Sequence, residues 1–63
     1  MRAVKVDGVP REVVNTLSSG PGAPVHTYEL RGGSYVYKVG AQWWLQERGQ
    51  FKRPVTVEEV ARG

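Results

Sequence analysis

The stretch that decides the fold is residues 25–55, which read VHTYELRGGSYVYKVGAQWWLQERGQFKRPV. Valine, threonine, tyrosine and tryptophan, which favour strands, fill the segments between three candidate tight turns. The turns are Gly32-Gly33, Gly40-Ala41 and Arg48-Gly49. We therefore predict an antiparallel meander, because such turns connect neighbouring strands of a sheet. The strands are expected over residues 25–31, 34–39 and 42–47, with a short fourth strand over residues 50–53.

The segment before the meander predicts a short strand and a helix. Alternating apolar and polar residues predict the strand over residues 2–6. Four apolar residues then recur at helical spacing and predict a helix over about residues 9–18. They are Val9, Val13, Val14 and Leu17. Residues 20–24, Gly-Pro-Gly-Ala-Pro, are expected to form a loop, because glycine and proline interrupt regular structure.

The segment after the meander predicts a second, shorter helix. Pro54 is expected to end the last strand. Thr56 and Glu59 then form a capping-box pattern, which predicts a helix over residues 57–62. The expected fold is a single α+β domain over residues 1–63. It would contain a small three- to four-stranded antiparallel sheet, one N-terminal helix and a short C-terminal helix.

Length and composition narrow the classes of function. The chain has 63 residues, nine lysines and arginines against six acidic residues, a net charge of +3, 40% apolar residues and no cysteine. A domain of this size buries only about 60% of the surface of its unfolded chain, so its core is thin. Disulfides and cysteine zinc sites are excluded, and no apolar run reaches the roughly 20 residues of a membrane span. Because the N-terminus lacks an apolar leader, we expect a cytoplasmic protein without membrane contact.

Two-residue turns would decide which side chains share a face of the sheet. Tyr28 would lie opposite Tyr37, and Tyr37 opposite Trp44. One face would then carry His26, Tyr28, Leu30, Tyr35, Tyr37, Val39, Gln42, Trp44, Gln46, Phe51 and Arg53. The other would carry Val25, Thr27, Glu29, Val36, Lys38, Trp43, Leu45, Glu47 and Lys52. Two short helices can cover only one face, and an uncovered apolar face usually binds a partner.

Three arrangements of the sheet remain open. Because aromatic side chains are usually buried, the favoured one places the aromatic face in the core. It exposes Val36, Trp43 and Leu45 beside Lys38 and Lys52. The second buries the aliphatic face and exposes Tyr28, Tyr35, Tyr37, Trp44 and Phe51 beside Arg53 and His26. In the third, the sheet curls into a small barrel that leaves little of either face exposed.

The leading hypothesis is a small non-enzymatic regulatory protein that binds DNA or RNA through the sheet. Aromatic rings can stack on bases while basic side chains contact phosphates. Tyr35, Tyr37 and Trp44, or alternatively Trp43, would stack on bases. Arg31, Lys38, Arg48, Lys52 and Arg53 would contact phosphates.

The alternative is a protein-binding module, either an inhibitor of a larger protein or a homodimer. An uncovered apolar face would dock on the partner, and a tryptophan is a common anchor of such contacts. Since adjacent residues of a strand point to opposite faces, one of Trp43 and Trp44 is expected to face outward. An exposed strand edge could also pair with a strand of the partner.

The sequence offers no set of residues for catalysis, a metal or a cofactor. His26 is the only histidine, and no cysteine or close carboxylate pair accompanies it. The run from Arg31 to Lys38 resembles the Gly-Ser-His strand of HicA-type toxins. Tyr35 stands at the position of their catalytic histidine, so the resemblance does not imply ribonuclease activity. Trp43-Trp44-Leu45, with Pro54 downstream, resembles the Trp-Trp strand of SH3 domains, whose acidic tyrosine-rich motif is absent here.

Overall fold

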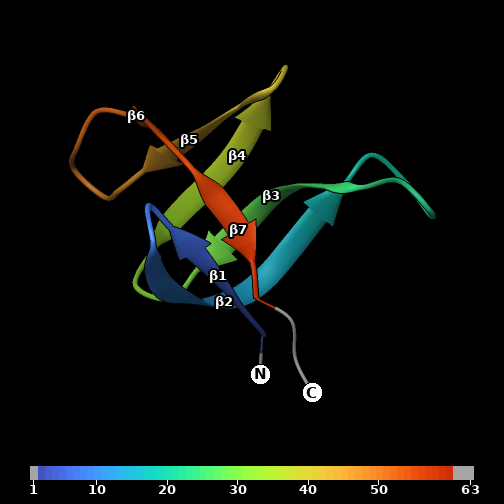
Figure 1. The fold of residues 1–63 in the computed structure, drawn as a ribbon, viewed down its shortest axis with the longest axis horizontal. Coiled ribbons are helices and arrows are strands. Elements are labelled where there is room, and N and C mark those ends of the chain that lie inside the picture. The colour runs from blue at the N-terminus through green and yellow to red at the C-terminus, as the bar shows by residue number, and fades with distance from the viewer. Residues whose placement is uncertain (1, 61–63) are drawn as a thin grey trace.

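The structure is a computed structural model that describes residues 2–60. All regular elements in this range are strands. They are β1 (Arg2–Val6), β2 (Val9–Ser18), β3 (Val25–Leu30), β4 (Ser34–Val39), β5 (Gln42–Gln46), β6 (Arg53–Val55) and β7 (Val57–Glu59) (Figure 1). The predicted α+β domain is therefore wrong, because the described part of the chain is all-β.

The strands of residues 2–60 close into a nearly complete barrel. Their order in the sheet is β6-β5-β4-β3-β2-β1-β7, and every pairing is antiparallel. β6 and β7 lie at opposite edges of the sheet, although Thr56 alone separates them in the sequence. The sheet therefore curves until its edges approach each other. In Figure 1, β7 continues from β6 and lies beside β1, with which it pairs. The sheet is therefore curled, as in the third predicted arrangement, but its outer face remains exposed.

A hairpin turn, and not a helix cap, leads into residues 9–18. Asp7 and Gly8 form a two-residue turn, with Val6 opposite Val9. Their φ angles are 52° and 83°, and type I′ hairpin turns require positive φ at both positions. Pro10 follows in β2, where it lies opposite Lys5 of β1. At that point β2 has no partner strand on its other side, so the missing N–H of proline costs no hydrogen bond.

The predicted helix over residues 9–18 is wrong because a bulge in β2 imitates helical spacing. The register of β2 against β3 shifts between Val13 and Asn15. A bulge adds one residue and reverses the alternation of the side chains that follow. Val14 and Leu17, which the helix would have buried, are 51% and 47% exposed.

The predicted helix that starts at residue 57 is also wrong, although residues 61 and 62 lie outside the described range. Thr56 does not cap a helix. Its N–H and its hydroxyl donate hydrogen bonds of 2.8 and 3.2 Å to the Asp7 carboxylate. The Glu59 carboxylate accepts a hydrogen bond from the Tyr28 hydroxyl instead of from the backbone of Thr56. Both side chains therefore hold β6 and β7 onto the rest of the barrel.

The turn between β4 and β5 has the predicted register. Gly40 and Ala41 form a two-residue turn, so Tyr37 lies opposite Trp44. Directly opposed residues of antiparallel strands share a face and lie in contact distance. The two aromatic side chains therefore lie side by side, as expected from the sequence.

The turn between β3 and β4 is one residue longer than predicted. Leu30 lies opposite Ser34, which leaves three residues in the turn. Arg31 does not pair with Ser34, because its N–H donates a 3.0 Å hydrogen bond to the Glu12 carbonyl of β2. A shift of one residue turns every side chain of β3 to the other face relative to β4. Tyr28 therefore lies opposite Val36 and not opposite Tyr37.

The predicted fourth strand over residues 50–53 is displaced toward the C-terminus. β6 spans Arg53–Val55, and residues 47–52 form the β5–β6 loop. Pro54 lies inside β6 and does not end a strand before it. This position tolerates proline because β6 is an edge strand that pairs with β5 alone.

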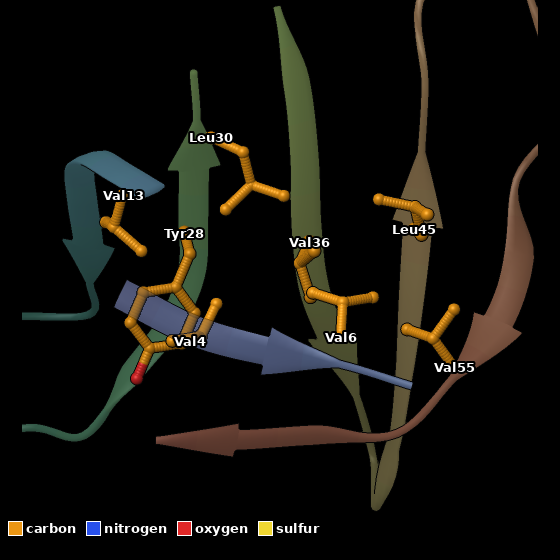
Figure 2. Packing of buried hydrophobic residues seen from close by; sticks show 8 residues of the cluster. All are labelled: Val4, Val6, Val13, Tyr28, Leu30, Val36, Leu45 and Val55. Carbon is orange, nitrogen blue, oxygen red and sulfur yellow. The ribbon is translucent and has the colours of Figure 1, made fainter. Parts of the chain in front are cut away.

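The core lies inside the barrel and combines the two predicted faces. Its buried side chains point toward one another in Figure 2: Val4, Val6, Val13, Tyr28, Leu30, Val36, Leu45 and Val55. Val36 and Leu45, which the favoured arrangement would have exposed, are 0% and 1% exposed. In β4 and β5 the aliphatic side is therefore the core, and the favoured arrangement is wrong there. Tyr28 and Leu30 join this side because of the shifted β3 register.

Candidate functional site

The outer face of the barrel carries a cross-strand row from five neighbouring strands. The strand register places each member of the row opposite the member on the neighbouring strand. The members are Leu17, Thr27, Tyr37, Trp44 and Pro54. Tyr35 lies two residues before Tyr37 on β4 and faces the same way. We call Tyr35, Tyr37 and Trp44 the aromatic platform.

The aromatic platform is open to solvent because the core lies on the opposite side of the same strands. Val36 separates the two tyrosines in the sequence and is fully buried. Tyr35 is 41% exposed, while Tyr37 and Trp44 are half-buried. The platform therefore belongs to the second predicted arrangement, with Tyr28 removed into the core.

Lys52 places a positive charge on the aromatic platform. Its Nζ lies 5.2 Å from the centroid of the Trp44 ring. At this distance the ring quadrupole attracts an ammonium group. Lys52 is exposed and belongs to the β5–β6 loop, so it reaches Trp44 from beyond the end of β5.

Trp43 faces the barrel interior, opposite to its neighbour. It packs against the core, and its ring lies 5.7 Å from the Tyr28 ring at an angle of 30°. The Nζ of Lys38 lies 6.0 Å from the Trp43 centroid. Trp43 and Lys38 thus form a separate pair on the inner side of β4 and β5.

Tyr28 links this inner pair to β7. Its hydroxyl donates a 2.9 Å hydrogen bond to the Glu59 carboxylate. Burial raises the pKa of Tyr28 to about 12, and the hydrogen bond to Glu59 and its negative charge act in the same direction. The hydroxyl is therefore a firmly protonated structural donor, which holds β7 against β3.

The five basic residues predicted to contact phosphates divide into two groups. Arg31 and Arg53 are held in ion pairs with Glu12 (3.3 Å) and Asp7 (3.1 Å). Lys38, Arg48 and Lys52 have no ion-pair partner within residues 2–60. The Arg48 guanidinium lies 3.6–3.7 Å from the point where a Cβ of Gly33 would be. Since Gly33 precedes β4, Arg48 lies near the Tyr35 end of the aromatic platform.

The structure thus brings together part of the predicted set. Tyr35, Tyr37, Trp44 and Lys52 share the outer face, and Arg48 lies near its end. Trp43, Lys38, Arg31 and Arg53 lie elsewhere, in the contacts described above. Sequence reasoning missed Leu17, the far member of the row, because it was assigned to a helix. The Asp-Gly turn signal would have indicated a strand directly after residue 8 in place of the helix, although not the position of Leu17 beyond the bulge.

Other features of residues 2–60 offer no competing site. A shallow pocket is lined by Arg2, Val13, Val14, Asn15 and Thr16, and it includes no platform residue. The described residues contain no group of three side chains that could hold a metal ion. No helix among them is long and apolar enough to cross a membrane. His26 is exposed, and its Nδ1 lies 2.8 Å from the hydroxyl of Thr27.

In comparisons with known proteins, no family model, curated protein or solved structure matches this chain. The roles of its residues therefore rest on the geometry of the chain itself. In that geometry, the outer face of β4 and β5 combines exposed rings with an adjacent positive charge.

Proposed function

We propose that this chain is a small, non-enzymatic regulatory protein of the cytoplasm that binds nucleic acid through the aromatic platform. The observation that supports the proposal is the position of Lys52 on the Trp44 ring, beside two further outward rings. Aromatic rings offer bases a stacking surface that works for any base. A neighbouring ammonium group supplies the contact to phosphate that stacking lacks. An open outer face suits this mode, because stacked bases need no pocket.

The charge distribution supports the same proposal. The full chain carries a net charge of +3. Within residues 2–60, three basic side chains of the β4–β6 region have no acidic partner, namely Lys38, Arg48 and Lys52. Uncompensated positive charge attracts the phosphate backbone over a distance of about a Debye length. Of these three, Lys52 and Arg48 lie beside the aromatic platform, so positive charge adjoins the proposed stacking surface.

A protein partner is the second candidate, and exposed aliphatic groups favour it. Leu17 and Val39 are 47% and 60% exposed and belong to the outer face. Trp43 faces inward, so Trp44 would be the anchor of such an interface. Strand addition has less support, because the edge strands β6 and β7 have three residues each and short edges pair poorly.

Titration of fluorescently labelled DNA and RNA at low salt tests the proposal. Fluorescence anisotropy should show binding that weakens as salt is added. Lys52→Gln should weaken binding more than Lys5→Gln, which removes the same charge from β1, outside the platform. Absence of binding at about 10⁻⁴ M, the weak end of non-specific affinity, would overturn the proposal. Sedimentation of the protein alone would then show whether a second copy occupies the face.

A further inference from the structure

The spacing of the aromatic platform restricts which form of nucleic acid it can accept. Tyr37 and Trp44 are opposed on neighbouring strands, which lie about 4.8 Å apart. Tyr35 and Tyr37 are separated by two residues of β4, or about 7 Å. Bases within a duplex follow one another at about 3.4 Å and cover each other's faces. The platform therefore fits bases that are unpaired and spread apart.

Lys52 occupies the stacking position on Trp44 in the free protein. Its Nζ lies over the ring, 5.2 Å from the centroid. A base that stacks on the same face must displace the ammonium group, since both need the open side of the ring. The cation–π contact is worth only about 0.5–1 kcal/mol at an exposed site, and a stacked base about 1–3 kcal/mol. Displacement is therefore favourable.

The displaced ammonium group stays close to the site. Lys52 belongs to the β5–β6 loop, which projects from the sheet in Figure 1. Its neighbour Phe51 is 97% exposed, so little packing restrains this part of the loop. Arg48 lies in the same loop, beside Gly33 at the Tyr35 end of the platform. A strand that crosses the platform thus meets one positive charge near Trp44 and another near Tyr35.

We infer that the ligand is a single strand of DNA or RNA, whose unpaired bases stack on Trp44 and on the platform tyrosines. Lys52 leaves the Trp44 ring when the base arrives and contacts the adjacent phosphate. This inference rests on the proposed nucleic-acid binding and names the form of the ligand. Trp44 is the stacking residue, and Lys52 is a cation that changes partner.

The test compares three ligands of equal length: a single-stranded oligothymidylate, its abasic analogue and a duplex. An oligouridylate in a parallel titration distinguishes RNA from DNA. The single strand should bind roughly tenfold or more tightly than the abasic strand, because base stacking contributes that much per base. The duplex should bind no more tightly than the abasic strand.

Tryptophan fluorescence reports the stacking step directly. In Trp43→Phe, Trp44 is the only tryptophan, and its emission should be quenched by the single strand but not by the duplex. Trp44→Ala should remove the preference for the single strand over the abasic strand, and Trp44→Phe should restore part of it. Circular dichroism of each variant verifies that the barrel remains folded.

Salt dependence tests the role of Lys52. In Lys52→Gln, the slope of log affinity against log salt should fall by about one, the loss of one phosphate contact. The matched variant Lys5→Gln should keep the slope. An unchanged slope in Lys52→Gln would refute the inference that Lys52 leaves the Trp44 ring to contact a phosphate.

Two further outcomes separate the inference from the proposed function. Equal affinity for single strand, abasic strand and duplex, with unchanged Trp44 emission, would refute the stacking inference and leave nucleic-acid binding in place. Absence of binding to all three ligands would refute the proposed function itself.

Discussion

Trp43 and Trp44 are neighbours in β5, and both are half-buried, yet they belong to different parts of the molecule. Trp43 packs against the core and the Tyr28 ring. Trp44 lies on the outer face between Tyr37 and Pro54 and under Lys52. The inner side of β5 thus contributes to stability, and we assign binding to its outer side. A barrel of this size has no second layer, so one strand must serve both purposes.

The largest expected effect is a difference in the free energy of unfolding between substitutions on the inner and outer sides of the sheet. Leu45→Ala should lower the free energy of unfolding by about 2–5 kcal/mol, because the side chain is 1% exposed and its removal leaves a cavity. Leu17→Ala, the same substitution on the outer face, should cost less than about 1 kcal/mol. Equilibrium unfolding in urea measures both values. Equal losses would contradict the assignment of inner and outer sides.

The two tryptophans provide the next test. Trp43→Ala should cost about 2–3 kcal/mol of stability, since it removes packing against the core, whereas Trp44→Ala should cost about 1 kcal/mol. Binding of the oligothymidylate should follow the reverse order and fall to the affinity of the abasic strand in Trp44→Ala. The assignment of binding to Trp44 would be contradicted if Trp43→Ala remained folded without binding the oligothymidylate, and Trp44→Ala still bound it.

A smaller effect concerns the hydroxyl that joins the inner side to β7. Tyr28→Phe should cost about 1 kcal/mol, the value of one hydrogen bond. Because the pKa of Tyr28 is raised from 10.0 to about 12, its contribution is complete below pH 10 and lost as the pH rises toward 12. Absorbance titration should show one late tyrosine that is missing in Tyr28→Phe. A tyrosine titration unaltered by the substitution at high pH would contradict this role.

The smallest effect is expected at Asp7, where the barrel closes. The hydrogen bond from the backbone of Thr56 lowers the pKa of Asp7 below its usual 3.8, as do the hydrogen bond and the charge of Arg53. A lowered pKa means that the contribution of Asp7 is present above pH 3.8 and lost as the pH falls through the folded-state pKa. In Asp7→Asn, stability should therefore decrease less steeply on acidification. Thermal unfolding followed from pH 6 to pH 2 measures the difference, with Glu58→Gln as the control.

The sequence predicted the bounds of β3, β4 and β5 to within one residue, because its turns and strand-forming residues agree. The pairing of Tyr37 with Trp44 follows from the two-residue turn at Gly40. The positions of three residues could not be predicted, for physical reasons. Leu17 follows a bulge that hides the period of a strand. Lys52 reaches Trp44 from a loop whose path depends on the whole barrel, and Tyr28 moved inward because Arg31 bonds to β2.

The error at the C-terminal end of the chain has a different cause. β1 and β7 pair with each other, and such long-range pairing leaves no trace in local sequence patterns. Residues 57–59 therefore resembled a capped helix, although Thr56 bonds to Asp7 and not to its own segment. For Asp7 itself, the following glycine was the usable signal, since Asp-Gly favours a type I′ turn.

The pairing of β1 with β7 also has a consequence for how the chain folds. Hairpins such as β4–β5 join residues close in sequence, whereas the closing ladder joins Val4 to Glu59. Contacts between distant residues pay the entropy of closing a long loop, and they slow folding. We therefore expect the hairpins to assemble first and the ladder between β1 and β7 to form last. Until this ladder forms, Val57 of β7, which packs against the core, remains in water, so the final step is also the one that completes the hydrophobic interior.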